Sequence, residues 1–191
     1  EDFMKGNFGF ASTLLDTLKK YGNKAPVMLS SSIQASLEGR FAGSEYGKSK
    51  LAGEELFRKY SQENGVKVLI YRFPNLFGKW CRPNYNSAVA TFCNNIANDL
   101  PIQVNDRKTE LELLYIDDLV EEMFLALNGE EHRDEQGHCY CPLTYKATLG
   151  RIVDLLYEFK ESRKNLSVPD MSDGFTKVLY STYLSYLPAD G

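Results

Sequence analysis

The sequence predicts an α/β fold in which a parallel sheet carries helices on both faces and a small subdomain is added. Three observations lead to this prediction. Apolar residues recur at helical spacing in several segments, short β-branched and apolar runs separate those segments, and the connections are short. Such alternation is typical of parallel sheets covered by helices. Because ligands bind beyond the carboxyl ends of such strands, a site is expected there.

The elements can be placed from their local signals. Ser44 can cap a helix over 45–64 that Gly65 ends, because serine accepts from free N–H groups and glycine adopts the left-handed conformation. Asp118 opens a later helix in a capping-box pattern, and Thr148 caps another. The remaining predictions are a helix over 2–21, strands over 26–30, 66–71 and 111–116, a loop over 33–44, and helices over 87–100, 148–162 and about 173–183.

Composition excludes several functional classes. A net charge of −4 gives no support to nucleic-acid binding, which usually requires a basic face. No apolar run approaches the roughly 20 residues that cross a bilayer, and the first residues lack the apolar core of a signal peptide. We therefore expect a cytoplasmic protein with no membrane or nucleic-acid partner.

The four cysteines do not predict a metal site. Cys139 and Cys141 are separated by one residue, which on a strand directs their thiols to opposite faces. That arrangement is poor geometry for zinc. We expect reduced thiols and no bound metal.

One motif is missing. A complete Rossmann dinucleotide-binding domain begins with a strand and a glycine-rich turn that cradles the pyrophosphate. The candidate glycines, Gly6 and Gly9, lie inside a helical pattern with no strand before them, so they are interpreted as helix-packing positions. The chain is therefore expected to lack the N-terminal strand–helix units of a Rossmann-like sheet.

Tyr46 and Lys50 stand four residues apart on one face of the predicted helix. A nearby cation lowers the pKa of a phenol from about 10. Such a tyrosine can exchange a proton with an alcohol while hydride moves to or from a cofactor. The spacing alone is weak, because tyrosine and lysine are common in this sequence, and a solvated helix face is the alternative.

Two further features follow predicted strands. Ser30, Ser31 and Ser32 end the first strand, where a hydroxyl can hydrogen-bond the oxygen that the tyrosine protonates; a serine-rich turn is the alternative. Pro74 and Asn75 follow the next strand, where the Asn75 amide can meet a ligand. An ordinary turn is the alternative there, since proline and asparagine are turn formers.

Together these residues resemble the extended short-chain dehydrogenases/reductases, which include NAD-dependent sugar-nucleotide epimerases, dehydratases and reductases. The resemblance implies that Ser32 is the hydroxyl partner, that Tyr46 is the general acid/base, and that Lys50 lowers its pKa and holds the nicotinamide ribose. The residues that carry it, in the family's order, are 30–32, 46–50 with Glu54, 72–78 and 115–118.

The same resemblance implies further binding residues. Pro74 is expected beside the nicotinamide, Asn75 near the sugar nucleotide, and Asn7 and Ser30 among the cofactor-binding residues. Residues 1–80 are assigned to the cofactor-binding core with the catalytic motif. Residues 81–191 are assigned to a substrate-binding subdomain, interleaved with the last core strand and helix.

A closer resemblance is to the reductase half of bifunctional capsular-polysaccharide enzymes that make the precursor of N-acetyl-L-fucosamine. It implies NADPH-dependent reduction of a UDP-linked 4-keto-2-acetamido-2,6-dideoxy sugar, with NAD as the alternative cofactor. It also implies that a zinc-binding cupin domain follows the reductase domain. The segments that carry this resemblance are 32–35, 74–81, 83–87 and 180–188.

One departure from the family concerns the diphosphate. Leu111 stands where many members carry an arginine that grips it. Arg82 and Arg107 are the candidate replacements, because a guanidinium suits bidentate phosphate binding. For each of them a solvated surface charge is the alternative.

The resemblance also implies a two-fold homodimer through helices 45–64 and 87–99, because in this family the helix that carries the tyrosine commonly packs with its neighbour against its symmetry mate. The first of these helices carries enough apolar surface for both a sheet and a partner, although all of it could face the sheet. The side chains concerned are Leu51, Leu56, Phe57 and Tyr60.

Two other functions compete with the reductase. The first is a UDP-sugar 4-epimerase or dehydratase that holds NAD. Dehydratases usually place acidic groups after the catalytic hydroxyl, and Ile33 and Gln34 stand there instead, which disfavours dehydration. The second is a non-catalytic fragment.

Overall fold

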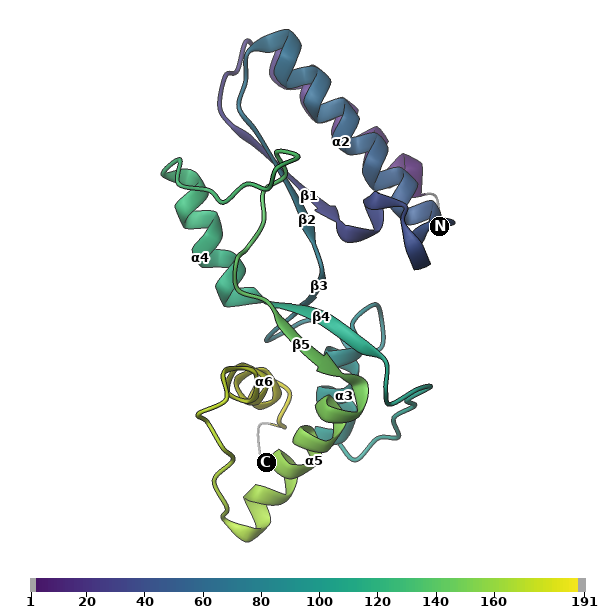
Figure 1. Ribbon diagram of the computed structural model, residues 1–191, viewed down its shortest axis with the longest axis vertical. Helices are drawn as coiled ribbons and strands as arrows, with labels where there is room; N and C mark the ends of the chain where they lie inside the picture. The colour runs from purple at the N-terminus through teal and green to yellow at the C-terminus, as the bar shows by residue number, and fades with distance from the viewer. Residues whose placement is uncertain (1–2, 189–191) are drawn as a thin grey trace. The chain divides into compact units, whose positions relative to one another are not determined.

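The computed structural model describes residues 3–188, which form two compact units (Figure 1). The first unit contains residues up to Pro74 together with 128–140, and the second contains 75–127 and the residues from Cys141 onward. The predicted roles, cofactor binding for 1–80 and substrate binding for 81–191, are not tested by this division into units and stay predictions.

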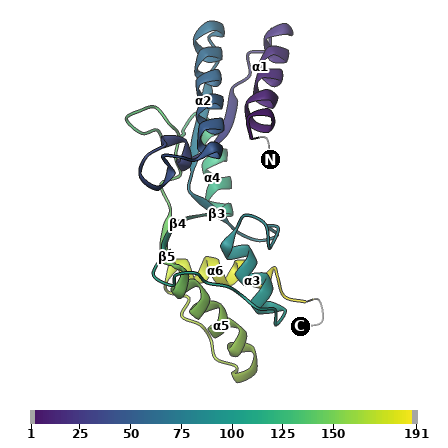
Figure 2. The ribbon, with the colours of Figure 1, turned by 90° about the vertical axis from the view of Figure 1, so that its right-hand side faces the viewer.

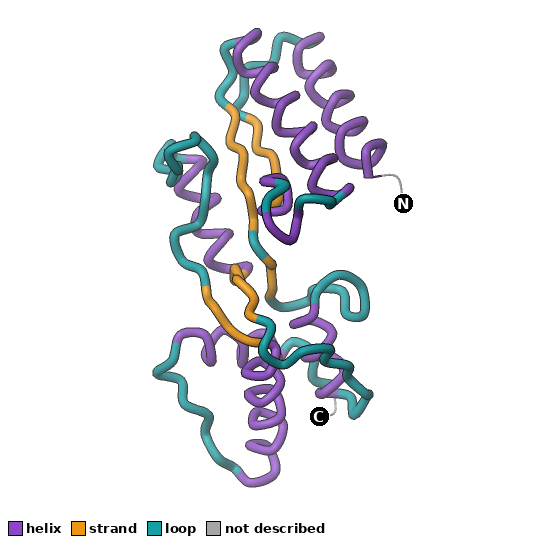
Figure 3. The backbone as a smooth tube through the Cα atoms, turned by 45° about the vertical axis from the view of Figure 1, so that its right-hand side comes forward, coloured by secondary structure: helices purple, strands orange, loops and turns teal. Residues whose placement is uncertain are grey.

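The first unit is built on two parallel strands, β1 (Val27–Ser32) and β2 (Val68–Phe73), which lie side by side in Figure 3. Their register pairs Val27 with Val68 and Ser32 with Phe73, so both carboxyl ends meet at one edge. Cys139 adds an isolated parallel bridge to Tyr71. The helices of this unit are a π-helical turn η1 (Met4–Gly9), α1 (Phe10–Lys20) and α2 (Glu45–Asn64).

Helix α2 has the limits that its sequence predicts. The Ser44 side chain accepts a hydrogen bond from the Gly47 N–H, and Gly65 ends the helix with a φ of 62°. Helices α1 and α2 lie beside each other (Figure 2) and share one apolar cluster with the strands. Phe57 and Tyr60 are buried in that cluster and Leu56 packs against it, so three of the four side chains considered for a dimer serve the core of this unit.

The second unit contains a three-stranded sheet in the order β3 (Asn75–Phe77), β4 (Glu110–Tyr115) and β5 (Tyr145–Thr148). Strands β3 and β4 are parallel, whereas β4 and β5 are antiparallel. Phe77, Leu113, Tyr115 and Ala147 of the sheet belong to one apolar core with three helices. These are α3 (Ala88–Ala97), α5 (Leu149–Asn165) and α6 (Gly174–Leu184), while α4 (Ile116–Leu127) directly follows β4.

The structure corrects several local predictions. Strands β3 and β5 have three and four residues and too little pattern to be recognised, and antiparallel β5 makes this sheet mixed. Helix α4 begins at Ile116, directly at the end of β4, and not at Asp118. The predicted loop 33–44 contains two 3₁₀ turns, η2 (Ile33–Ser36) and η3 (Gly39–Phe41).

The amino-terminal helix is also different from its prediction. Residue 2 lies outside the described part of the chain, and the first turn is π-helical. A Cβ added at Gly6 or Gly9 would meet no described atom within 4 Å, so these glycines do not pack against a neighbour in the described chain. Between residues 3 and 188, no helix has the length and apolar character needed to cross a membrane.

Candidate active site

The predicted acid/base pair lies at the start of α2, beside the carboxyl end of β1. The Lys50 ammonium donates to the Ser30 carbonyl at 3.0 Å, and its Nζ lies 5.5 Å from the centre of the Tyr46 ring. Both side chains are half-buried. The structure therefore brings Ser30, Tyr46 and Lys50 together, as the sequence predicts.

The pKa of Tyr46 does not shift in the predicted direction. Burial raises the pKa of the Tyr46 phenol above its ordinary value, and burial lowers the pKa of Lys50. The ammonium lies near the ring and donates to a backbone carbonyl, so desolvation dominates over the attraction of the cation. Tyr46 is therefore held protonated at neutral pH.

Ser32, the predicted hydroxyl partner, ends β1 and caps η2. Its Oγ accepts from the Gln34 N–H at 3.2 Å. The Gln34 side chain in turn accepts from the Ser44 hydroxyl at 2.8 Å, and Ser44 caps α2. Hydrogen bonds through Gln34 and Ser44 thus link Ser32 to α2, the helix that carries Tyr46.

Gly47 permits this close approach. A Cβ at this position would collide with the backbone carbonyl of Gln34 and press against the Leu37 side chain. The first turn of α2 therefore rests directly on η2, and a glycine next to Tyr46 is a requirement of that contact.

Asn7, the predicted cofactor-facing residue, contacts α2. Its amide donates to the Ser49 hydroxyl at 3.0 Å, and Ser49 donates to the Tyr46 carbonyl at 2.8 Å. Asn7 lies in the π-helical turn η1, a kind of distortion that is frequent at functional sites. Its cofactor-binding role stays a prediction.

The remaining predicted binding residues divide between the units. Pro74, expected beside the nicotinamide, directly follows β2 in the first unit, while the predicted substrate-binding residues Asn75, Arg82 and Arg107 belong to the second. The Asn75 amide donates to the Glu112 carbonyl at 3.0 Å, and the Arg82 guanidinium lies 5.3 Å from the centre of the Tyr85 ring.

Arg107 is already engaged with protein groups. It donates to Asp154 at 2.6 Å and to the Gly150 carbonyl at 3.3 Å. It lines an open pocket together with Arg151, Asp154 and Glu158, so cations and carboxylates are mixed there. This arrangement favours the alternative of a paired surface charge over a diphosphate site. Within residues 3–188, no group of three or more His, Cys, Asp or Glu side chains is arranged to hold a metal ion.

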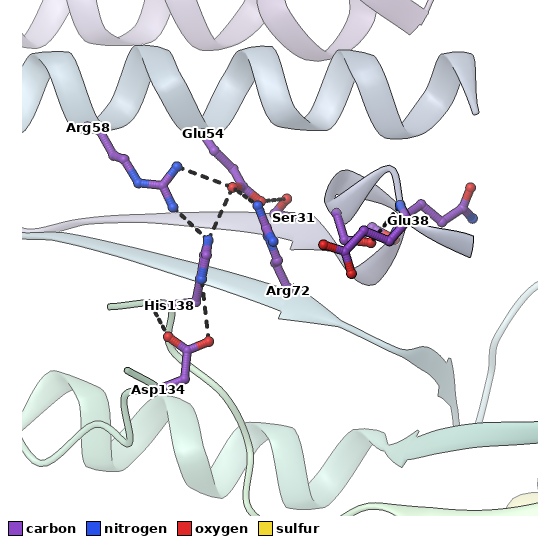
Figure 4. A network of polar contacts seen from close by, with 10 residues as sticks. Ser31, Glu38, Glu54, Arg58, Arg72, Asp134 and His138 are labelled. Carbon is purple, nitrogen blue, oxygen red and sulfur yellow. Dashed lines mark hydrogen bonds and ion pairs between the residues drawn. The ribbon is translucent and has the colours of Figure 1, made fainter. Parts of the chain in front are cut away.

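The sequence did not predict a buried polar network centred on Glu54, one helical turn after Lys50 on α2 (Figure 4). Glu54 is fully buried and accepts from Arg72 through both carboxylate oxygens, at 2.8 and 2.7 Å. It also accepts from the Ser31 hydroxyl at 2.6 Å. The signal was present, because Tyr46, Lys50 and Glu54 are spaced by four residues along one helix face.

Further members of the network come from the segment 128–140. His138 Nε2 lies 3.4 Å from the Glu54 carboxylate and 2.6 Å from Arg58 Nη2. Asp134 Oδ2 lies 3.4 Å from the other ring nitrogen of His138. Burial by itself raises the pKa of Glu54, but the hydrogen bonds of Arg72 and Ser31 and the nearby charges outweigh it and lower this pKa below its usual value.

The fold and this site define a class. Residues 1–140 match the NAD dependent epimerase/dehydratase family, and the chain belongs to that family. Its whole length is similar to a UDP-2-acetamido-2,6-beta-L-arabino-hexul-4-ose reductase from Pseudomonas aeruginosa, with 42% identity over 190 residues. The chain spans about half of that relative, 49% of its length.

Solved structures show the same likeness. A capsular polysaccharide assembling protein, CapF from Staphylococcus aureus, is 50% identical with a TM-score of 0.88, over 95% of this chain and 47% of that one. A UDP-glucose 4-epimerase from Thermotoga maritima is 19% identical with a TM-score of 0.74, over 96% of this chain and 70% of that one. These likenesses confirm the predicted Rossmann-like α/β class.

Proposed function

We propose that the protein reduces the 4-keto group of a UDP-linked 2-acetamido-2,6-dideoxyhexose with NADPH, in the synthesis of capsular or other surface polysaccharide precursors. The observation that carries the proposal is the geometry of the pair: Lys50 Nζ lies 5.5 Å from the centre of the half-buried Tyr46 ring and donates to the Ser30 carbonyl near the end of β1. The similarity of the whole chain to half of a curated 4-keto sugar-nucleotide reductase supports reduction over the other reactions of the family.

The residues fit the nicotinamide end of such a cofactor. Lys50 and Tyr46 present an ammonium and a phenol side by side at the carboxyl end of β1, where two donors can hold ribose hydroxyls. The bound cofactor supplies the hydride that is added to the sugar carbonyl carbon.

The chain's own residues supply the proton. As the carbonyl carbon is reduced, negative charge develops on its oxygen, and Tyr46 donates its phenolic proton to that oxygen. The Ser32 hydroxyl donates a hydrogen bond to the same oxygen and orients it. The positive charge of Lys50 stabilises the phenolate that remains on Tyr46. A tyrosine that is protonated at neutral pH suits this direction of the reaction.

The wider assembly belongs to the same proposal. We infer a homodimer through α2 and α3, a zinc-binding cupin domain after the reductase part of the full-length protein, and a cytoplasmic location. The cupin domain and the location are supported by the resemblance of the chain to bifunctional reductases. The dimer is supported by the same resemblance and by the half-buried Leu51 of α2, which is outside the apolar cluster of the first unit. Light scattering of the full-length protein at micromolar concentration measures the dimer directly, and a monomer would refute it.

The test of the activity follows NADPH absorbance with the full-length protein and a UDP-linked 4-keto sugar. We expect one NADPH to be consumed for each keto sugar, and a parallel assay with NADH compares the alternative cofactor. Conversion of a UDP-sugar without net consumption of NADPH would show an epimerase that holds NAD, and the proposed reduction would then be wrong. A folded full-length protein that neither binds NADPH nor turns over the sugar would show a non-catalytic role, and the proposed function would be wrong.

A further inference from the structure

Glu54 is a buried carboxylate that the proposed reaction does not use. Glu54 lies on α2 and its side chain is fully buried. It accepts one hydrogen bond from Ser31 of β1 and two from Arg72 of β2 (Figure 4). All these contacts lie within the first unit. One carboxylate therefore joins three elements at the edge where the two strands end.

Each element that Glu54 joins carries a residue of the proposed site. Ser31 directly precedes Ser32 on β1, and Arg72 lies two residues before Pro74 on β2. Glu54 itself follows Lys50 by one helical turn and Tyr46 by two. A shift of the carboxylate contacts would change the relative placement of all three elements. The position of the Ser32 hydroxyl relative to the Tyr46 phenol would change with it.

The chemistry of the contacts is directional. The guanidinium of Arg72 meets both oxygens of Glu54 in a planar, two-bond arrangement, which fixes orientation as well as distance. The Ser31 hydroxyl at 2.6 Å adds a third fixed direction. An apolar core could supply comparable stability here, since a buried ion pair is often no more stabilising than well-packed apolar residues. What apolar packing does not supply is this fixed geometry.

We propose that Glu54, together with Arg72 and Ser31, positions the Ser32 hydroxyl relative to Tyr46 and Lys50, and that this network acts on turnover without contacting the substrate. The inference rests on the proposed reductase function. Glu54, Arg72 and Ser31 are in this view positioning residues, because none of them is assigned a contact with the reacting atoms.

The test separates positioning from simple stability in the full-length protein. Ser31→Ala removes the link between Glu54 and β1 and leaves the Glu54–Arg72 ion pair intact, so no buried charge is exposed. We expect kcat to fall on the order of 10- to 100-fold, because a misplacement of about 1 Å has such an effect. The KM values for sugar and NADPH should change by less than about threefold, since binding groups are untouched.

Two companion variants sharpen the result. Ser31→Thr keeps a hydroxyl at this position and should restore most of the lost kcat. Arg72→Lys keeps the positive charge but not the two-bond geometry, and it should lower kcat with little change in KM. Glu131→Gln is the matched control, since it breaks the Lys67–Glu131 ion pair at the opposite end of β2 and should leave kcat unchanged.

The outcomes are distinguishable when the thermal midpoint Tm and the folded fraction are measured beside kinetics. A folded Ser31→Ala protein with normal kcat, whatever its Tm, overturns the inference and leaves the reductase function standing. A folded Ser31→Thr protein as slow as Ser31→Ala also overturns it. If the parent protein does not consume NADPH while the sugar nucleotide is bound, the proposed function fails and this inference fails with it.

Discussion

The two ends of the strand pair β1–β2 hold ion pairs of the same chemistry in different surroundings. At the carboxyl end, Glu54 is fully buried and is held by Arg72, Ser31 and Arg58. At the amino end, Glu131 meets Lys67 at 2.8 Å and Arg133 at 3.0 Å. The Glu131 side chain is 8% exposed and its two cations are 40% and 36% exposed, whereas Arg72, the main partner of the fully buried Glu54, is 24% exposed.

The difference shows what burial adds to an ion pair. Cations that reach water stay partly hydrated and are screened by salt, so an ion pair with them contributes less stability than one with covered cations. A buried carboxylate with several directed donors is held in one geometry, and its loss leaves cations without a counter-charge. The proposed catalytic residues lie at the end of the strands where the buried pair is found.

The largest expected effect is on turnover. Tyr46→Phe in the full-length protein should lower kcat by about 10²- to 10⁴-fold, as is typical of losing a general acid. Stability should change little, because phenylalanine keeps the aromatic ring, which lies 5.5 Å from the Phe3 ring and from Lys50 Nζ. Steady-state kinetics with NADPH measures the effect, and near-normal turnover would remove Tyr46 from the mechanism.

The second prediction compares the two ion pairs directly. Glu54→Ala should lower the free energy of unfolding by on the order of 3 kcal/mol, because Arg72 and Arg58 lose their shared buried counter-charge. Glu131→Ala should cost less than Glu54→Ala, since Lys67 and Arg133 are more exposed than Arg72 and can be hydrated when the carboxylate is removed. Denaturant unfolding at neutral pH checks both values, and equal losses would contradict the contrast between the two ends.

The third prediction concerns the contact beneath Tyr46. Gly47→Ala should destabilise the protein by about 1–3 kcal/mol, the usual cost of overpacking, because the added methyl meets the Gln34 carbonyl. Turnover should fall as well, since the first turn of α2 must move. Gly53→Ala is the control on the same helix, where a Cβ would meet only the Leu29 side chain at 3.9 Å. A stable and fully active Gly47→Ala protein would contradict the close approach.

The smallest effect is expected in acid. The pKa of Glu54 is lowered in the folded state, so its contribution to stability is complete above its unfolded pKa of about 4.3. That contribution is lost as the pH falls through the folded pKa. Glu54→Gln should therefore show a shallower loss of stability below about pH 4.3 than the parent. Parallel curves of unfolding free energy against pH would mean that Glu54 does not supply this acid sensitivity.

Much of α2 and the acid/base pair could be predicted from local sequence. The Ser44 cap and the Gly65 stop depend on backbone chemistry within a few residues, so the helix limits are confirmed. The placement of Tyr46 and Lys50 on one face follows from helical geometry alone. The short strands β3 and β5 were missed, because three or four residues are too few for a periodic signal.

The sequence by itself determined the α/β class, the limits of α2 and the identity of the residues at the strand ends, because these depend on periodicity and on capping within a few residues. Only the tertiary structure decided the direction in which the pKa of Tyr46 shifts, since desolvation depends on what covers the ring. It alone also decided that Glu54 is paired with Arg72 and Ser31, residues separated from it by 18 and 23 positions. Their contact is created when α2 packs across both strands, and no local pattern encodes it.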